Sequence, residues 1–282
     1  MTIQDIIRTL DSFWEKEGCV LGQPYPGEVG AGTFNPLTFF RVLGQALWKV
    51  AYVELSKRPK DGRYGTNPFR LQEFHQYQVV LKPSPQKIQD IYLKSLAVLG
   101  IDLNKHDVRF VEDDWESETL DARGLGWEVW LDGMEITQFT YFQKMGGVEL
   151  EPVSVELTYG LGRIAMIVQE KDSMWELEWG AGVKYKELYK QEEQELCAFN
   201  FELADVELEL ELFNKFEGEA KRFFKEGFVY PGYDYALRCS HILNVLDARK
   251  AISPDERKNY IARVRKLANL AAQLWLEKGA TE

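Results

Sequence analysis

Cysteine and histidine are scarce in this sequence of 282 residues, and long apolar runs are missing. Cys19, Cys197 and Cys239 lie far apart, a spacing that fits neither a disulfide framework nor a zinc site, so we expect a reducing, cytoplasmic compartment. No stretch approaches the roughly 20 apolar residues of a membrane-spanning helix, and the polar segment after Met1 argues against a signal peptide. The 8 Trp, 13 Tyr and 16 Phe exclude a disordered chain.

Motifs of the common nucleotide-binding and hydrolytic folds are also missing. The sequence has no Gly-Lys-Ser/Thr P-loop and no complete G-x-G-x-x-G after a predicted strand. His75, His106 and His241 are far apart, and no serine lies in a nucleophile elbow. We therefore expect each histidine to be a surface or structural residue rather than a catalyst.

Basic residues are outnumbered by acidic ones, 34 to 45, which gives a formal net charge of −11. Phosphate contacts supply much of the affinity for nucleic acid, so the chain as a whole lacks the charge to bind one by itself. Residues 56–70 nevertheless hold five basic residues and one acid, in a loop between predicted strands. Residues 192–219 hold ten acids and one base, and we interpret this acidic run as a solvated face.

Hydrophobic periodicity predicts an α+β protein: a largely antiparallel sheet with packed helices over residues 1–171, then an all-helical C-terminal domain over residues 172–282. The predicted strands are 19–21, 50–57, 74–81, 108–112, 127–131, 134–142 and 153–159. The first part has four predicted helices. One begins after the N-cap Thr2, and the other three cover 37–49, 85–99 and 160–169. Asp132-Gly133 predicts a hairpin turn.

Polar side chains recur at every second position of two predicted strands, so each set shares one face of the sheet. One set is Phe74, Gln76 and Gln78, and the other is Ser154, Glu156 and Thr158. Arg163 follows the second strand across a glycine turn. Such a face is compatible with simple solvent exposure, but amides, a carboxylate and arginines together also suit a small zwitterion beside a polyphosphate.

Three segments resemble the signature motifs of class II aminoacyl-tRNA synthetases. Arg58 followed by a loop and Arg70-Leu-Gln-Glu-Phe74 resembles motif 2, and Gly160-Leu-Gly162-Arg163 resembles motif 3. The first helix with Gly18-Cys-Val-Leu-Gly-Gln-Pro24 resembles motif 1, the element of the dimer interface. Gly162 departs from the G-L-E-R of many relatives, but because the arginine is kept we expect activity to be unaffected.

Longer strings resemble one family in particular, the alpha subunit of bacterial heterotetrameric glycyl-tRNA synthetases, over essentially the whole chain. They are Glu28-Val-Gly-Ala-Gly-Thr33, Asp61-Gly-Arg-Tyr-Gly-Thr-Asn-Pro68, residues 126–142 and Glu156-Leu-Thr-Tyr-Gly160. The resemblance implies a ligase that forms glycyl-adenylate from glycine and ATP and then transfers glycine to tRNA(Gly). The glycine carboxylate is already ionised near neutral pH, so the first step needs positioning and charge stabilisation rather than a base.

The resemblance also implies the residues that bind ATP. Arg58 would contact the α-phosphate and Arg163 the γ-phosphate, and these two are the candidate catalytic residues. Phe74 would stack beneath the adenine, with Arg70 approaching the nucleotide. Planar arginines suit such contacts because they bind phosphate oxygens bidentately.

Glu135 and Gln138 resemble the family element that holds Mg²⁺ between the phosphates. Strict strand alternation would put these two residues on opposite faces, so this interpretation requires a β-bulge. The alternative is that Glu135 is an exposed strand residue without a metal.

Glycine has no side chain to grip, so its site needs an acid for the ammonium group and walls that exclude larger amino acids. Glu156 is the expected ammonium partner. The expected polar lining is Thr33, Gln76, Gln78 and Thr158. Trp115 is a candidate wall by resemblance, with an ordinary core tryptophan as the alternative.

The region after residue 171 resembles no basic anticodon-binding module. The resemblance implies a separate β subunit that carries most tRNA recognition, in an α2β2 assembly built on an α homodimer. Two alternatives remain: an amino-acid adenylating enzyme that never uses tRNA, and a non-catalytic scaffold of the class II type.

Overall fold

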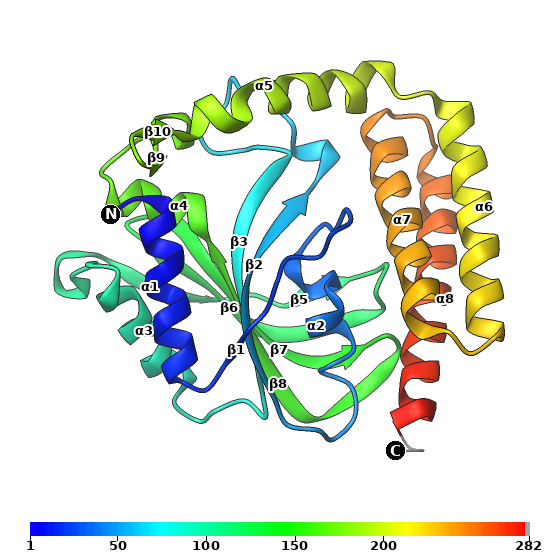
Figure 1. Ribbon diagram of the computed structural model, residues 1–282, viewed down its shortest axis with the longest axis horizontal. Helices are drawn as coiled ribbons and strands as arrows, with labels where there is room; N and C mark the ends of the chain where they lie inside the picture. The colour runs from blue at the N-terminus through cyan, green and yellow to red at the C-terminus, as the bar shows by residue number, and fades with distance from the viewer. Residues whose placement is uncertain (280–282) are drawn as a thin grey trace.

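Alternating apolar strands form one mostly antiparallel sheet in the computed structural model, which describes residues 1–279 (Figure 1). The strand order is β1-β2-β3-β8-β7-β6-β4, with β5 beside β6; β1 runs parallel to β2, and the other pairs are antiparallel. The strands are β1 (Val20–Leu21), β2 (Trp48–Lys57), β3 (Glu73–Lys82), β4 (Val108–Glu112), β5 (Trp115–Ser117), β6 (Ala122–Leu131), β7 (Met134–Met145) and β8 (Val148–Gly160).

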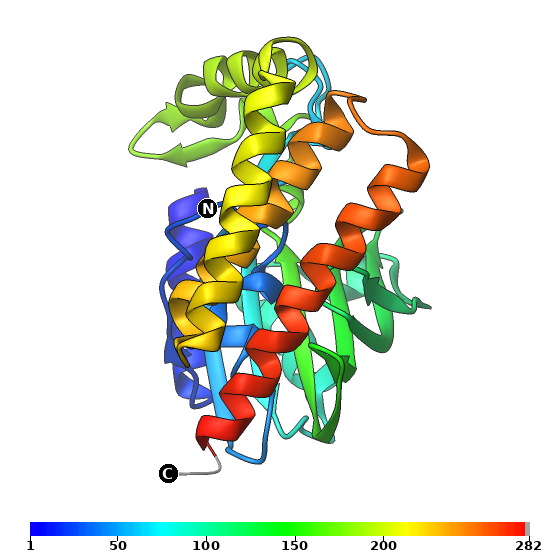
Figure 2. The ribbon, with the colours of Figure 1, turned by 90° about the vertical axis from the view of Figure 1, so that its right-hand side faces the viewer.

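Helices cover both faces of this sheet (Figures 1 and 2). The α-helices of residues 1–279 are α1 (Ile3–Lys16), α2 (Pro36–Phe39), α3 (Ile88–Val98), α4 (Leu161–Val168), α5 (Tyr185–Ala198), α6 (Val206–Lys225), α7 (Val229–Ala248) and α8 (Pro254–Gly279). Tyr77 and Val79 of β3 join α1, α3 and α4 in one apolar core. Tyr52 and Val80 point the opposite way and join α2 and α6–α8 in a second core. The expected α+β class, with an antiparallel sheet followed by C-terminal helices, is confirmed.

Local sequence signals account for several element ends. Thr2 and Asp5 form the reciprocal capping box at the start of α1, and Gly18 follows the helix with a φ of +88° that favours glycine. Asp132 and Gly133 both have positive φ and turn β6 into β7, as the hairpin signal predicts.

Two predicted helices differ from the structure. The helix expected over 37–49 is limited to α2, and β2 already begins at Trp48. The buried ammonium of Lys82 donates to the carbonyls of Arg41 and Leu43, and Gly44 has a φ of +70°, so these interactions end the helix. The helix expected from Pro85 begins at Ile88, because the preceding residues form a turn in which the Ile88 backbone N–H donates to Pro85 O at 3.3 Å.

The region after residue 171 is not all-helical. A two-stranded hairpin, β9 (Glu178–Gly180) and β10 (Val183–Lys184), precedes α5. Its turn uses Ala181 and Gly182 at positive φ, a signal that the sequence interpretation missed. From this hairpin α5 crosses the end of the sheet towards α6 (Figure 1). The division of the chain at residue 171 remains a prediction.

Candidate active site

Four central strands present a row of polar side chains on the face towards α6–α8. The register pairs Gln78 with Thr158 and Thr158 with Gln138, so β3, β8 and β7 each contribute one residue to the same row. Between β8 and β3, the Thr158 hydroxyl donates to Gln78 Oε1 at 2.9 Å. Between β2 and β3, the Ser56 hydroxyl donates to Gln76 Oε1 at 2.6 Å. The alternation predicted for these strands therefore produces a continuous polar surface.

The β-bulge that the Glu135–Gln138 pair requires is present. Trp130 pairs with Glu135 and the preceding Val129 pairs with Thr137, so Ile136 is an extra residue in β7. Ile136 turns into the core beneath the sheet. As a result Glu135 and Gln138 line the same cleft despite their odd spacing.

This cleft has a volume of about 570 Å³ and opens above the ends of β2, β3, β7 and β8. It gathers all six predicted ATP-binding residues and two of the predicted glycine-binding residues. These lining residues are Arg58, Arg70, Phe74, Gln76, Glu135, Gln138, Thr158 and Arg163. Asp61, Arg63, Asn67 and Met174 also line it, and the sequence interpretation did not propose them for the site.

The three predicted arginines of the cleft each have a defined partner. Arg163, in the first turn of α4, donates from one guanidinium nitrogen to Glu135 O and Oε2, both at 2.8 Å. The Arg58 Nε donates to Gly30 O at 2.8 Å, and the Arg58 guanidinium lies 5.1 Å from the centre of the Phe74 ring. Arg70 is exposed and lies 4.0 Å from Asp61. The cleft thus combines a cationic wall, an aromatic face and two carboxylates, Asp61 and Glu135.

A buried polar cluster adjoins the cleft through Thr158. Glu156 is only 2% exposed, and the Thr33 hydroxyl lies 2.9 Å from both of its carboxylate oxygens. Burial raises the pKa of Glu156 to about 8, and the hydrogen bond from Thr33 limits that rise. A buried carboxyl without an opposite charge favours a cationic ligand, because such a ligand would stabilise its ionised form.

The loop that carries Thr33 is held by a second buried carboxylate, Glu54, which the sequence interpretation did not propose. Its two oxygens accept the backbone N–H of Tyr25 at 3.1 Å and the Asn35 Nδ2 amide at 2.7 Å. Burial raises the pKa of Glu54 to about 7. The loop also presses closely on the sheet: a Cβ at position 32 would meet the Gln78 side chain at 2.6 Å, so only glycine fits there.

Trp115 lies apart from this cleft. It is half-buried and packs edge-on against Phe142, with ring centres 5.6 Å apart, as part of the second apolar core. This placement favours the packing interpretation of Trp115, and its role as a wall for glycine stays a prediction.

Gly162 and His75 have structural explanations. A Cβ at position 162 would lie 2.5 Å from the Met174 methyl group, so Met174 fills the space that a larger residue would occupy. His75 packs among Trp179, Tyr185 and Tyr189, and burial lowers its pKa to about 4. His75 is therefore neutral near pH 7, in agreement with a structural histidine.

Comparison with known proteins gives one match over nearly the whole chain. The family model described as glycyl-tRNA synthetase alpha subunit matches residues 3–280. The chain belongs to the glycyl-tRNA synthetase alpha subunit family. Two solved structures from Desulfitobacterium hafniense are also similar: a pyrrolysyl-tRNA synthetase, at 13% identity and a TM-score of 0.43, and PylSc, a pyrrolysyl-tRNA synthetase, at 14% identity and a TM-score of 0.44. In each case the match covers 65% of this chain and 76% of the other.

Membership of the glycyl-tRNA synthetase alpha subunit family carries two consequences. Aminoacyl-tRNA synthetases use ATP, so a nucleotide site is required, and an alpha subunit has a beta partner. Among residues 1–279, no helix has the length and apolar character to cross a membrane.

Proposed function

We propose that this chain condenses glycine with ATP to glycyl-adenylate and pyrophosphate and, with a β subunit, transfers glycine to the 3′ end of tRNA(Gly). The observation that carries the proposal is the junction of two sites. An arginine-lined cleft of about 570 Å³ meets a buried carboxylate cluster at Thr158. A polyphosphate fits the first site and an ammonium group fits the second. Family membership indicates that the substrates with these groups are ATP and glycine.

ATP lies in the cleft in this proposal. Arg58 contacts the α-phosphate, where negative charge builds as the glycine carboxylate attacks, and Arg163 holds the γ-phosphate. Phe74 offers its ring to the adenine, and Arg70 closes on the nucleotide from the exposed loop. Permanently charged guanidinium groups in place before the reaction lower the barrier without moving a proton.

Glycine lies beside Glu156, whose carboxylate pairs with the substrate ammonium. Thr33, Gln78, Gln76 and Thr158 supply the polar lining that orients the glycine carboxylate towards ATP. Larger amino acids are excluded because Gly32 and Gln78 are already in close contact above this cluster.

Magnesium is the proposed metal, and the donor set fits it. Mg²⁺ is commonly held by one or two carboxylates together with substrate phosphates. Glu135 provides one carboxylate in the cleft, and Gln138 provides an amide oxygen, since its Nε2 is bonded to Asp113 at 2.6 Å. When bound there, the metal would offset phosphate charge.

The proposed assembly is α2β2 in the cytoplasm, with tRNA contacted mainly through β. The α homodimer is proposed to form around α1 and the edge strand β1, where Val20 is 59% exposed. The three cysteines are free and buried, which suits a reducing compartment.

The test is amino-acid-dependent ATP–pyrophosphate exchange by the purified chain, with and without β, across all twenty amino acids. We expect exchange with glycine alone. Exchange without any charging of tRNA in the presence of β would favour the tRNA-independent enzyme, and no exchange under either condition would favour the non-catalytic scaffold.

A further inference from the structure

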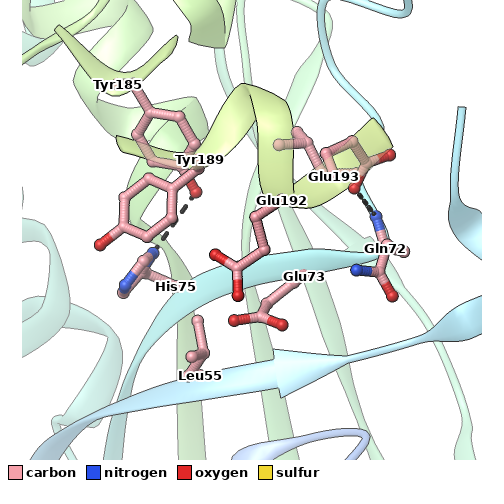
Figure 3. A pocket seen from close by; sticks show the side chains of 9 residues that line it. Leu55, Gln72, Glu73, His75, Tyr185, Tyr189, Glu192 and Glu193 are labelled. Carbon is pink, nitrogen blue, oxygen red and sulfur yellow. Dashed lines mark hydrogen bonds between the residues drawn. The ribbon is translucent and has the colours of Figure 1, made fainter. Parts of the chain in front are cut away.

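One carboxylate from a distant helix holds two points of the cleft loop between β2 and β3, one in the middle of the loop and one directly before β3. Glu193 of α5 is only 3% exposed. Its Oε1 accepts the backbone N–H of Arg63 and its Oε2 accepts the backbone N–H of Gln72, each at 3.0 Å. Figure 3 shows Glu193 above β3 with the bond to Gln72 drawn. Arg63 and Gln72 lie on either side of Arg70, so this double contact sets the width of the loop.

Neighbouring groups of α5 and the segment after it follow the same loop. The backbone N–H of Tyr64 lies 3.2 Å from Cys197 Sγ, and the Asn200 amide donates to Gln72 Oε1 at 3.0 Å. A Cβ at Gly62 would lie 2.5 Å from Cys197 Sγ, so the loop rests directly on α5. The cavity between α5 and β3 is only about 10 Å³, room for a single water at most, so a ligand is not what this contact serves (Figure 3).

We propose that Glu193 is a positioning residue for ATP: it holds the loop so that Arg63 and Arg70 face the nucleotide cleft. The inference rests on the proposed function, because it assigns a role in ATP binding to a residue outside the cleft. Glu193 does not line the cleft, whereas Arg63 and Arg70 do. The residues around Glu156 belong to other segments and do not depend on this contact.

The charge of Glu193 matters because both of its oxygens accept. In Glu193→Gln the side chain keeps its shape, but one oxygen becomes an NH2 group that faces a backbone N–H. One hydrogen bond is then lost and two donors oppose each other in a buried place. Glu192→Gln is the matched control, because it makes the same chemical change on the neighbouring, exposed residue of the same helix.

The experiment compares both variants of the full chain, purified with its β partner, in glycine-dependent ATP–pyrophosphate exchange. For E193Q we expect the KM for ATP to rise at least fivefold while the KM for glycine stays within twofold. E192Q should have the wild-type KM for ATP and for glycine. Equal rises in both KM values would overturn the positioning role and indicate a general structural one, and unchanged values would overturn it entirely.

Hydrogen–deuterium exchange over residues 58–72 gives a readout independent of activity. E193Q should exchange faster there than wild type and E192Q, with no change around residues 154–158. If the wild type shows no ATP–pyrophosphate exchange, the proposed function fails, while hydrogen–deuterium exchange still tests the Glu193 contact. Equal protection in E193Q and wild type would refute the inference even if the enzyme activates glycine.

Discussion

At the scale of single residues, Glu156 is the group whose environment most constrains function. It is buried, contacts the Thr33 hydroxyl, and has a pKa raised to about 8 by burial. Near pH 7 the Glu156 carboxyl is therefore mostly protonated when no ligand is bound, whereas a bound ammonium group favours its ionised form. If Glu156 pairs with the glycine ammonium as proposed, glycine binding must release a proton, so the affinity for glycine depends on pH.

This linkage predicts weaker glycine binding in acid. Below about pH 8 the dissociation constant should rise by up to about tenfold per pH unit, because glycine must displace the proton of Glu156. Calorimetry in two buffers of different ionisation enthalpy should find close to one proton released per glycine at pH 7. Glu156→Gln should bind at least about a hundredfold more weakly at pH 8 and show no pH dependence, given the loss of a buried charge partner.

Glu149→Gln is the control for that experiment, since Glu149 lies on the same strand but is exposed and forms an ion pair with the surface residue Arg123. It should behave as the wild type. A pH-independent affinity in the wild type would exclude Glu156 as the ammonium partner.

At the scale of elements, the pairing of β6 with β7 combines a bulge at one end with a close approach of the two strands further along. The bulge at Ile136 brings Glu135 into the cleft, and the neighbouring β6 carries glycines where β7 approaches closely. At Gly126 a Cβ would lie 2.0 Å from Phe139 O, a backbone atom that is held in the ladder. On α6, by contrast, a Cβ at Gly218 would meet nothing within 4 Å.

Two alanine substitutions should therefore have opposite effects on stability. Gly126→Ala should lower the free energy of unfolding by about 1–3 kcal/mol, because the methyl group forces β6 and β7 apart. Gly218→Ala should raise it by up to about 1 kcal/mol, through better helix propensity in the interior of α6. Denaturant titration of both variants measures the two changes, and a neutral Gly126→Ala would contradict the close approach of the strands.

At the scale of the whole molecule, the charge distribution supports the proposed division between amino-acid activation on this chain and tRNA recognition on β. The chain carries a net charge of −11, and its cleft concentrates arginines in a small area suited to a nucleotide rather than to a long polyanion. Contacts with tRNA phosphates need a broad basic surface, and in the proposed assembly the β partner supplies it.

The chain alone should accordingly bind tRNA(Gly) weakly, and addition of β should restore tight binding. Fluorescence anisotropy with labelled tRNA at about 0.15 M salt measures this difference, and a salt series reports how many phosphates are contacted. Tight, salt-resistant binding by the chain without β would show that the division of labour is wrong.

Features governed by neighbouring residues could be predicted from the sequence. Strand alternation placed Gln76 and Gln78 on one face of their strand and Glu156 and Thr158 on one face of theirs, and the register puts both sets on the same face of the sheet. The capping box at Thr2 and the turn at Asp132 follow from local hydrogen bonds and allowed φ values. The odd spacing of Glu135 and Gln138 even required the bulge that the structure contains.

Contacts between segments far apart in the sequence could not be predicted, and they decide how the site is held. Glu193 was interpreted as part of a solvated acidic face, yet it is buried against a loop more than 100 residues away. Lys82 ends a helix that periodicity alone would extend, and Thr33 meets Glu156 only because the glycine-rich loop folds over the sheet. The sequence alone therefore determined the strands, the faces and the family motifs. Only the tertiary structure decided which buried polar groups satisfy one another, because a buried donor or acceptor takes its partner from whichever segment packs against it.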